Sequence, residues 1–418
     1  SYLEKLLDGV EVEWLPLGEV SALRRGRVMS KGYLTENFGP YPVYSSQTAN
    51  NGKIGSINTF DFDGEYISWT TDGANAGTVF YRTGKFSITN VCGLITLKSK
   101  YSLIYKFLFY WLTIEAKKHV YSGMGNPKLM SHQVENIPVP IPCPDNPEKS
   151  LAIQSEIVRI LDTFSALTAE LTAELTAELN MRKKQYNYYR DQLLSFDEEQ
   201  EKPIYLEKLM DGVEVEWRTL GEIAVIYDGT HKTPKYTASG VPFVSVQNIK
   251  NLYGTNKYIS PEDFKTYKNK PRKHDLFMTR IGDVGTCAIV EDDRPLAYYV
   301  TLALIRINQQ IAVPGFIRYL IESRFGKAEL YKRTLIHAVP MKINLGEIGK
   351  VAVPIPCPDN PEKSLAIQSE IVRILDKFDT LTNSITEGLP REIELRQKQY
   401  EYYRNLLFSF PKPETVSN

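Results

Sequence analysis

The feature that most constrains this chain is an internal repeat. Residues 139–162, VPIPCPDNPEKSLAIQSEIVRILD, return unchanged at 353–376, and KQYNYYR at 184–190 returns as KQYEYYR at 398–404. A shorter segment at 2–14 returns at 205–217 with one difference. More than a hundred residues of unrelated sequence separate the copies, so they do not stack on one another as in a solenoid. The repeat therefore predicts two copies of one scaffold, related by a pseudo-two-fold axis, each serving its own globular domain.

The boundaries of the repeats divide the 418 residues into five parts. A chain of this length exceeds one ordinary core, which agrees with more than one domain. In chain order the parts are a short N-terminal repeat (1–14), a first variable domain (15–138), a central region with a strap, a long helix and the second short repeat (139–217), a second variable domain (218–352), and a C-terminal region with a strap and a long helix (353–418).

The net charge of zero conceals an uneven distribution along the chain. Region 15–138 holds 13 Lys and Arg against 8 Asp and Glu, and region 218–352 holds 20 against 12. The remaining residues hold 17 against 30. The variable domains are therefore basic, which favours contact with phosphate, and the repeats are acidic. Ordinary scatter would explain one such region, but explains less readily a partition that follows the repeat boundaries.

Each long repeat predicts an extended strap followed by a helix. The strap, IPVPIPCP from Ile137, has a proline at every second or third position, which excludes a helix or a central strand. Asp145 and Asn146 are expected in a turn, and Pro147 at the first helical position. Apolar residues then recur at steps of three and four over about 148–196, which indicates an amphipathic helix roughly 70 Å long. The matching stripe of the second copy is expected to pair with it as an antiparallel coiled coil; it consists of Ile367, Ile371, Ile374, Leu375, Phe378 and Leu381.

Three tandem TAEL units lie within the first helix, at 168–179. Ala, Glu and Leu are strong helix formers, and each unit would lengthen the helix by about 6 Å. The aligned stretch of the second copy, 382–393, contains Gly388 and Pro390, which are expected to break or kink the helix. The two spacers are therefore not equivalent.

Both variable domains alternate short β-rich runs with Gly, Asn, Asp and Pro, and each ends in a helix-like stretch, at 103–120 and 314–334. This pattern predicts an α+β fold with a mixed, loop-rich sheet. The whole chain is thus expected to be two globular mixed α/β domains separated by two long helices.

The sequence carries no catalytic constellation. It has no Walker loop, no H-E-x-x-H, no Rossmann loop and no adenine-methylase N-P-P-[YF] motif. PDNPEK at 144–149 superficially resembles a nuclease core, but a turn and a helix cap explain it in both copies. The five histidines are scattered and the four cysteines form no C-x-x-C pair, so neither a metal site nor disulfides are expected. No apolar run spans a bilayer and no signal peptide is evident, so we expect a cytoplasmic protein without its own cofactor or metal.

What remains is recognition chemistry. Polar side chains read base edges, and Lys, Arg, small hydroxyl residues and backbone amides hold phosphates. Each variable domain has four polar, glycine-rich loops of this kind, although any one loop is also compatible with a solvated turn. The candidate DNA-binding residues are Tyr44, Ser45, Ser46, Gln47, Asn51, Lys53, Thr71, Asp72, Asn75, Asn126 and Lys128 in the first domain, and Thr230, His231, Lys232, Thr233, Gln247, Asn248, Arg280, Asp283 and Lys342 in the second.

The motifs together resemble the specificity subunits of type I restriction–modification systems. The resemblance lies in W-x-x-L-G-E at each domain start, DGTHKTP at 228–234, TDGANAG at 71–77, GNPKLM at 125–130, and the proline strap leading into Q-x-E-I-V-x-I-L-D. The tandem TAEL units are similar to the type IC branch. The second domain has AVPMK at 338–342 where the first has MGNPK at 124–128, so their contacts are expected to differ.

The resemblance implies a non-catalytic subunit. Each variable region would be a target recognition domain that reads one half of a split, asymmetric site in double-stranded DNA. The helices would set the unread spacer and dock two methylase subunits carrying S-adenosylmethionine, and restriction subunits using ATP and Mg²⁺ would complete the complex. Residues implied in spacing and docking are Thr168, Glu170, Leu171, Glu174, Leu175, Glu178 and Leu179. Two alternatives are a helical scaffold that binds only proteins and a lone nuclease or methylase.

Overall fold

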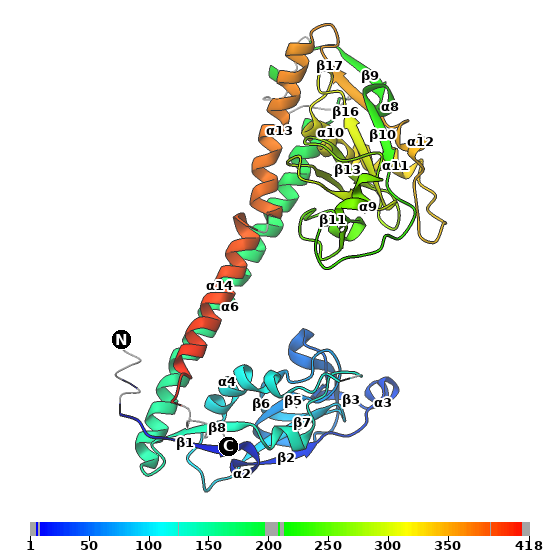
Figure 1. Cartoon of the computed structure of the whole chain (residues 1–418). Coiled ribbons are helices and arrows are strands. Elements are labelled where there is room, and N and C mark those ends of the chain that lie inside the picture. Colours follow the sequence, from blue (N-terminus) through cyan, green and yellow to red (C-terminus); the bar gives the residue numbers. More distant parts are fainter. Residues whose placement is uncertain are drawn as a thin grey trace. The chain divides into compact units, whose positions relative to one another are not determined.

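The computed structural model describes residues 6, 9–123, 125–196, 208–209, 213–384 and 386–411. In the two short repeats, residues 2–5, 7–8, 205–207 and 210–212 lie outside the described residues. The chain forms two compact units: unit 1 comprises Ser1–Glu174 and Glu394–Asn418, and unit 2 comprises Leu175–Ile393 (Figure 1). Each unit therefore combines one variable domain with segments of both long repeats.

Unit 1 is built around a six-stranded sheet with strand order β2-β7-β5-β6-β3-β4, in which only β3 and β6 pair in parallel. The core formed by α4 and β5 includes Trp69, Phe107 and Trp111, all almost fully buried. The elements of the variable domain are α2 (Leu17–Val20), β2 (Ser21–Arg25), α3 (Lys31–Glu36), β3 (Phe38–Tyr44), η1 (Ala49–Gly52), β4 (Lys53–Ile57), β5 (Phe62–Thr70), β6 (Val79–Ile88), β7 (Cys92–Leu97), α4 (Tyr105–Glu115), η2 (Ala116–His119) and α5 (Ser131–Val134).

Unit 2 has a four-stranded sheet, β10-β16-β13-β14, and a three-stranded sheet, β12-β11-β15. Its largest core contains Phe316, Tyr319 and Leu320 of α10. The elements of this variable domain are α8 (Leu220–Ile223), β10 (Ala224–Asp228), β11 (Val241–Val244), η3 (Val246–Asn248), β12 (Tyr258–Ile259), α9 (Pro261–Lys265), β13 (Leu276–Thr279), β14 (Cys287–Ile289), β15 (Ala297–Tyr298), β16 (Leu302–Ile307), α10 (Pro314–Glu322), α11 (Arg324–Tyr331) and α12 (Leu345–Ile348). The α+β prediction, including a helical end to each variable domain, is confirmed.

The proline strap is a strand whose partner the sequence analysis did not predict. In unit 1, β8 (Pro138–Pro142) pairs antiparallel with β1 (Val12–Pro16), the end of the short repeat, so that Trp14 faces Pro140. In unit 2, β17 (Ala352–Pro356) pairs with β9 (Val215–Thr219) in the same way. Among the described residues each sheet has these two strands, so each strand keeps an open edge that tolerates proline, which lacks an N–H. In each copy, the end of the short repeat and the proline strap of the long repeat therefore form one two-stranded ribbon.

Both long helices begin where the sequence predicts. Helix α6 (Pro147–Leu193) starts after Asn146, whose Oδ1 accepts a hydrogen bond from Lys149 N at 3.0 Å. Helix α13 (Pro361–Asn383) starts after Asn360, which caps it identically. An asparagine cap with proline at the first helical position stabilises a helix start. The cap and turn account for PDNPEK in both copies.

The apolar stripe of each long helix has two uses, and the sequence analysis assigned it only one. Ile367, Ile371 and Leu375, expected in the coiled coil, lie in the core of unit 2 with α10. The equivalent first turns of α6 pack into the core of unit 1. These positions attach each long helix to the variable domain that precedes it. They cover the apolar faces of α10 and α4, which would otherwise be in contact with water.

Further along, the helices pair with each other. In unit 1, Phe164 of α6 packs on Tyr403 of α14 (Gly388–Leu407) with ring centroids 5.5 Å apart, and Ser165 Oγ donates to Tyr400 Oη at 3.0 Å. The contacts move forward along α6, from 164 to 165, and backward along α14, from 403 to 400. The two helices are therefore antiparallel. In unit 2 the equivalent rings, Phe378 and Tyr189, stack at 5.4 Å. The prediction of antiparallel helix pairing is confirmed.

The second spacer is broken, as predicted. Helix α13 ends at Asn383 and α14 begins at Gly388, which has a φ of +77°. Pro390 lies in the first turn of α14, where proline is tolerated, so the break falls just before the two residues that predict it. By contrast, α6 continues without interruption through the three TAEL units.

Candidate nucleic-acid interface

The four predicted loops of unit 1, at 44–47, 50–53, 70–75 and 122–128, are joined by hydrogen bonds. The Asn75 side-chain amide donates to Ser46 O at 2.9 Å, which links the loop 71–77 to the β3–β4 hairpin. Gly73 N donates to Pro127 O at 3.0 Å, and a β-bridge joins Asp72 to Lys128. The hairpin itself carries the other two loops, so all the predicted side chains of this domain belong to one connected loop cluster.

A buried arginine holds the turn that carries Asn51. Arg82 donates from Nη1 to Asn51 O at 2.7 Å and from Nε to Ser68 Oγ at 3.0 Å, and its guanidinium lies 3.6 Å from the centre of the Tyr44 ring. Asn50 and Asn51 have φ values of 50° and 55°, a left-handed conformation that asparagine tolerates better than most residues. Burial lowers the pKa of Arg82 to about 10. Arg82 is therefore a positioning residue for this turn.

The predicted loops of unit 2, at 228–233, 247–248, 280–283 and 337–342, are also joined, around the segment 298–301. This segment begins at the end of β15 and is hydrogen-bonded directly to three of the loops, and the fourth, at 337–342, is joined through the loop that follows β13. The linking bonds are Val300 N to Thr230 O (3.0 Å), Arg280 N to Thr301 O (3.0 Å), Val246 N to Thr301 Oγ1 (3.1 Å) and Gly282 N to Met341 O (2.9 Å). The four loops therefore form a second connected loop cluster.

The two clusters share one backbone framework. Segments 88–91 and 298–301 are equivalent, because β3 and β11 pair with them in parallel at Tyr44–Ile88 and Val244–Tyr298. We call each of them the central segment of its unit. A glycine faces each central segment: a Cβ on Gly26 would lie 2.2 Å from Thr89 O, and one on Gly229 would lie 2.4 Å from Tyr299 O. Only glycine permits this approach, so the framework requires it at both places.

The side chains that hold this framework differ. Trp69 Nε1 donates to Leu129 O at 2.9 Å in unit 1, whereas Arg280 Nε donates to the equivalent Ile343 O at 3.2 Å in unit 2. The charge at the end of the first domain strand is also inverted. Arg25 of β2 donates to Thr71 Oγ1 at 3.3 Å. The equivalent residue of β10, Asp228, instead accepts from Arg280 Nη1 at 2.5 Å.

The predicted residues are not equally accessible. Thr71 and Arg280 are buried, so in this structure they hold loops together. Gln47, Asn248 and Asp283 are half-buried and bond to residues nearby in the sequence: Gln47 Nε2 donates to Lys53 O, Asn248 Oδ1 accepts from Ser245 N, and Asp283 accepts from two threonine hydroxyls. Also half-buried are Tyr44, Ser45, Ser46, Asp72, Asn75 and Thr230. The exposed residues are Asn51, Lys53, Asn126, Lys128, His231, Lys232, Thr233, Gln247 and Lys342.

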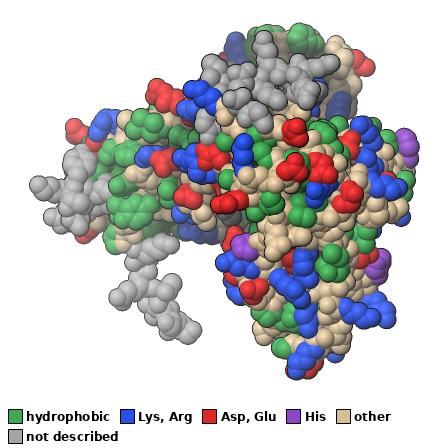
Figure 2. Space-filling view, turned by 90° about the horizontal axis from the view of Figure 1, so that it is seen from above, with side chains coloured by type: hydrophobic (Ala, Val, Ile, Leu, Met, Phe, Trp, Pro, Cys, Tyr) green, Lys and Arg blue, Asp and Glu red, His purple; other side chains and the backbone are tan. Residues whose placement is uncertain are grey.

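Arg25 and Arg27 of the first domain, which the sequence analysis did not select, also contact the loop cluster: Arg25 bonds to Thr71, and Arg27 forms a β-bridge with Thr89. Arg27 Nε donates to Asp61 at 2.9 Å, and hydrogen bonds to Tyr33 and Asp61 raise the pKa of Arg27 above its usual value. The sequence contained a signal for them. Counted from the L-G-E that opens each domain, Arg25 and Arg27 align with Asp228 and Thr230, which lie in a predicted loop of the second domain. In the space-filling view, Lys and Arg side chains gather on the projecting part of the surface at the lower right (Figure 2).

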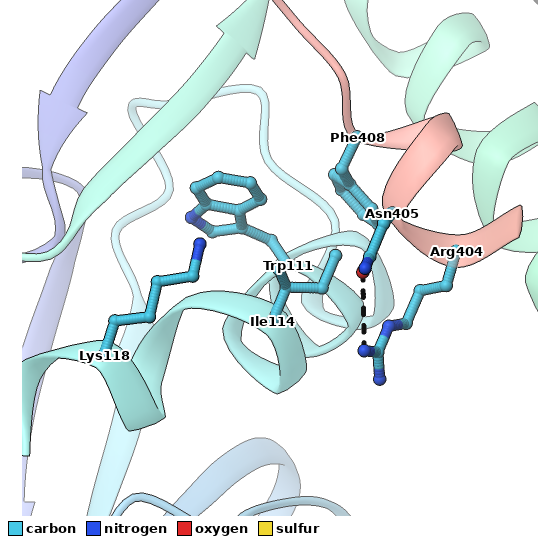
Figure 3. A pocket seen from close by; sticks show the side chains of 6 residues that line it. All are labelled: Trp111, Ile114, Lys118, Arg404, Asn405 and Phe408. Carbon is cyan, nitrogen blue, oxygen red and sulfur yellow. Dashed lines mark hydrogen bonds between the residues drawn. The ribbon is translucent and has the colours of Figure 1, made fainter. Parts of the chain in front are cut away.

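A pocket of about 360 Å³ lies elsewhere in unit 1, between α4, η2 and α14 (Figure 3). Its lining is Trp111, Ile114, Lys118, Arg404, Asn405 and Phe408. Arg404 Nη2 donates to Asn405 Oδ1 at 3.4 Å. The lining offers aromatic and cationic groups but no carboxylate, thiol or imidazole for catalysis. Across the described part of the chain, no cluster of His, Cys, Asp and Glu could hold a metal. Nor is any helix found there with the length and apolarity that crossing a membrane demands.

The chain belongs to the type I restriction modification DNA specificity domain family, whose model matches residues 9–181 and 212–395. It is 40% identical over 456 residues to the type I restriction enzyme EcoR124I/EcoR124II specificity subunit of Escherichia coli, an alignment covering 100% of this chain and 99% of the relative. It is 37% identical over 412 residues to the EcoprrI specificity subunit of the same organism, covering 93% and 92%.

A solved chain from a study of complex assembly and conformational transition in a type I restriction–modification system has the same fold. The TM-score is 0.59 at 14% sequence identity, and the match covers 96% of this chain and 98% of the other. At this identity the likeness concerns the fold alone.

Proposed function

We propose that this chain is the DNA-reading, non-catalytic subunit of a type I restriction–modification complex, with each variable domain reading one half of a split site. The observation that carries the proposal is the pair of loop clusters. Both use one backbone framework, but the side chains they present differ, as expected of two readers of different base sequences. Their domains hold an excess of basic residues, which attracts the phosphate backbone. Base edges would then be read by exposed groups such as Asn126 and Gln247.

The long helices would dock two methylase subunits and set the distance between the half-sites. Large apolar side chains are exposed on them: Leu167, Met181, Tyr188, Leu395, Tyr402 and Leu406. Such side chains on a helix surface favour a protein partner. In the TAEL segment Glu170 and Glu174 are exposed, while Thr168, Leu171, Leu175, Glu178 and Leu179 are half-buried. The charge of exposed glutamates keeps this surface away from phosphate.

The catalytic groups would then belong to the partners. Methylase subunits would supply S-adenosylmethionine for adenine methylation, and restriction subunits would use ATP and Mg²⁺. Chromosomal DNA as the ligand places the proposed activity in the cytoplasm.

Exchange of one variable domain tests the proposal. The native chain and a chimera with another family member's domain at 15–138 are each expressed with methylase subunits, and methylated sites are mapped by sequencing the cell's DNA. We expect the chimera to change one half-site and keep the other, because the loop cluster of unit 2 is unaltered. The reciprocal exchange at 218–352 is the control and should alter only the opposite half. Alteration of both half-sites by either exchange would contradict modular reading.

A further inference from the structure

The loop between α11 and α12 carries an exposed apolar surface beside the polar loops of unit 2. Its side chains are Leu335, Ile336, Val339 and Met341, which are 49%, 40%, 99% and 37% exposed. We call these four residues the apolar tip. In Figure 1 the loop is the orange hairpin that projects beside the labels α11 and α12. Nearly full exposure of a valine offers water an apolar surface that folding alone does not require.

The apolar tip is tied to the candidate interface by the backbone. Leu335 N donates to Lys342 O at 2.8 Å, which closes the loop, and Gly282 N donates to Met341 O at 2.9 Å. A β-bridge between Ile281 and Lys342 adds a second link to the loop 280–285. The tip is therefore held next to the polar loop 280–285, and the exposed Lys342 lies at the base of the tip's own loop.

The equivalent loop of unit 1 has a different chemistry. It forms the matching bridges, Asp72–Lys128 and Tyr121–Lys128, but its exposed side chains include Asn126 and Lys128, with Tyr121 65% exposed. One framework therefore presents a mainly polar loop in one domain and an aliphatic loop in the other. A structural need of the framework would call for the same chemistry in both, so the difference points to what each loop meets.

We propose that the apolar tip contacts the C5-methyl group of a thymine in the half-site read by the second domain. This inference rests on the proposed function. Among the groups that base pairs present in the major groove, the thymine methyl is the apolar one, and aliphatic side chains recognise it by excluding water from it. The exposed Lys342 provides charge complementarity that a duplex requires and that an apolar protein surface does not.

Deoxyuridine substitution tests this contact without altering base pairing, because uracil lacks only the methyl group. After the recognised site has been mapped, each thymine of the second half-site is replaced in turn. Binding of the full chain with its methylase subunits is then measured by competition. At one position or more, we expect roughly fourfold weaker binding, which corresponds to about 0.8 kcal/mol for one buried methyl group.

The variant Val339→Ser completes a double-mutant cycle. It should weaken binding to thymine DNA by a similar factor and make binding insensitive to uracil at the same position, because the contact is already lost. The matched control is Val225→Ser, an exposed valine (54%) of the same domain that lies on β10. It should retain the full response to uracil.

The outcomes separate the inference from the proposed function. Specific binding with no response to uracil at any position overturns the apolar tip as a base reader and leaves DNA reading intact. A second half-site without thymine in either strand does the same. Two results together would assign the tip to a protein partner instead: Val339→Ser no longer assembles with methylase subunits, and the assembled wild type binds uracil DNA as tightly as thymine DNA. Absence of site-specific binding by the wild-type complex would contradict the proposed function itself.

Discussion

At the scale of single residues, the two loop clusters differ in how their frameworks are held. In unit 1 a neutral indole, Trp69, binds the carbonyl of Leu129. In unit 2 the charged Arg280 binds the equivalent carbonyl, with its side chain only 8% exposed and in contact with Asp228. A buried guanidinium needs a counter-charge, whereas an indole does not. The second domain therefore depends on an ion pair where the first depends on a hydrogen bond from a neutral side chain.

Neutralising one side of this ion pair should be costly. In Asp228→Ala, Arg280 stays buried without its carboxylate, so we expect about 3 kcal/mol of lost stability in unit 2. The double variant Asp228→Ala with Arg280→Met should recover most of that loss, because no unpaired charge remains. Urea unfolding of the full chain, followed by fluorescence, measures both. Equal destabilisation of the single and double variants would contradict this account.

Arg82 makes a different prediction in unit 1. In Arg82→Met, the turn at Asn50 and Asn51 loses the hydrogen bond that offsets its left-handed backbone, and we expect about 2 kcal/mol of lost stability. Mapped methylation should then show relaxed reading of the first half-site and unchanged reading of the second. Arg24→Met, a substitution of an exposed arginine on β2, is the control for charge and length. A normal first half-site would show that Arg82 does not position the turn.

At the scale of elements, local signals predicted much of the fold. The asparagine caps, the proline at each helix start and the break near Gly388 follow from the conformations those residues allow. The pairing of strap and short repeat could not be predicted, because a two-stranded ribbon leaves no periodic signal in proline-rich sequence. Likewise, one apolar stripe has the same period whether it faces a sheet-bearing domain or a second helix. The polar loops were recognisable by composition, but Arg82 and the central segments were not, since they act through tertiary contacts.

The continuous course of α6 makes the TAEL prediction specific. Deletion of one unit, for example 172–175, removes about 6 Å from the helix, a little under two base-pair steps at roughly 3.4 Å each. We expect a shorter preferred spacer and unchanged half-sites, measured by methylation of duplexes that differ only in spacer length. Ala173→Gln, at an exposed position of the same helix, keeps the length and should keep the spacer. An unaltered spacer preference after the deletion would rule out a ruler.

At the scale of the whole molecule, each long repeat ends in the core of the unit that holds the other variable domain. The ends of the two copies are in this sense exchanged. The end of α14 and the residues after it contribute Leu407, Phe408 and Phe410 to the core of unit 1, although the variable domain there comes from the other end of the chain. The end of α6 and the residues after it contribute the equivalent Leu193, Leu194 and Phe196 to the core of unit 2. Neither unit is complete without a segment that follows the opposite variable domain, which explains why one chain carries both repeats.

This exchange predicts the behaviour of the first half alone. In a fragment of residues 1–204, the core of unit 1 lacks its last three apolar side chains, and the end of α6 has no partner. A second copy supplies both, because the ring contact of Phe164 with Tyr403 has its equivalent in Phe378 with Tyr189. We therefore expect the fragment to form a symmetric dimer, detectable by sedimentation equilibrium. A fragment that stays monomeric at tens of micromolar would contradict the exchange.

One position distinguishes specific dimerisation from nonspecific association. Phe408 packs against Phe107 at 5.2 Å and Trp111 at 5.7 Å, and in the dimer Leu194 would take its place with a smaller side chain. Leu194→Phe should fill that space and strengthen each of two interfaces by about 1 kcal/mol, which lowers the dissociation constant roughly 30-fold. In the full chain the same substitution should be neutral or destabilising, because Leu194 is already 2% exposed in the core of unit 2 and a larger ring would overpack it. The opposite effects expected in fragment and full chain arise from one residue placed in two different cores.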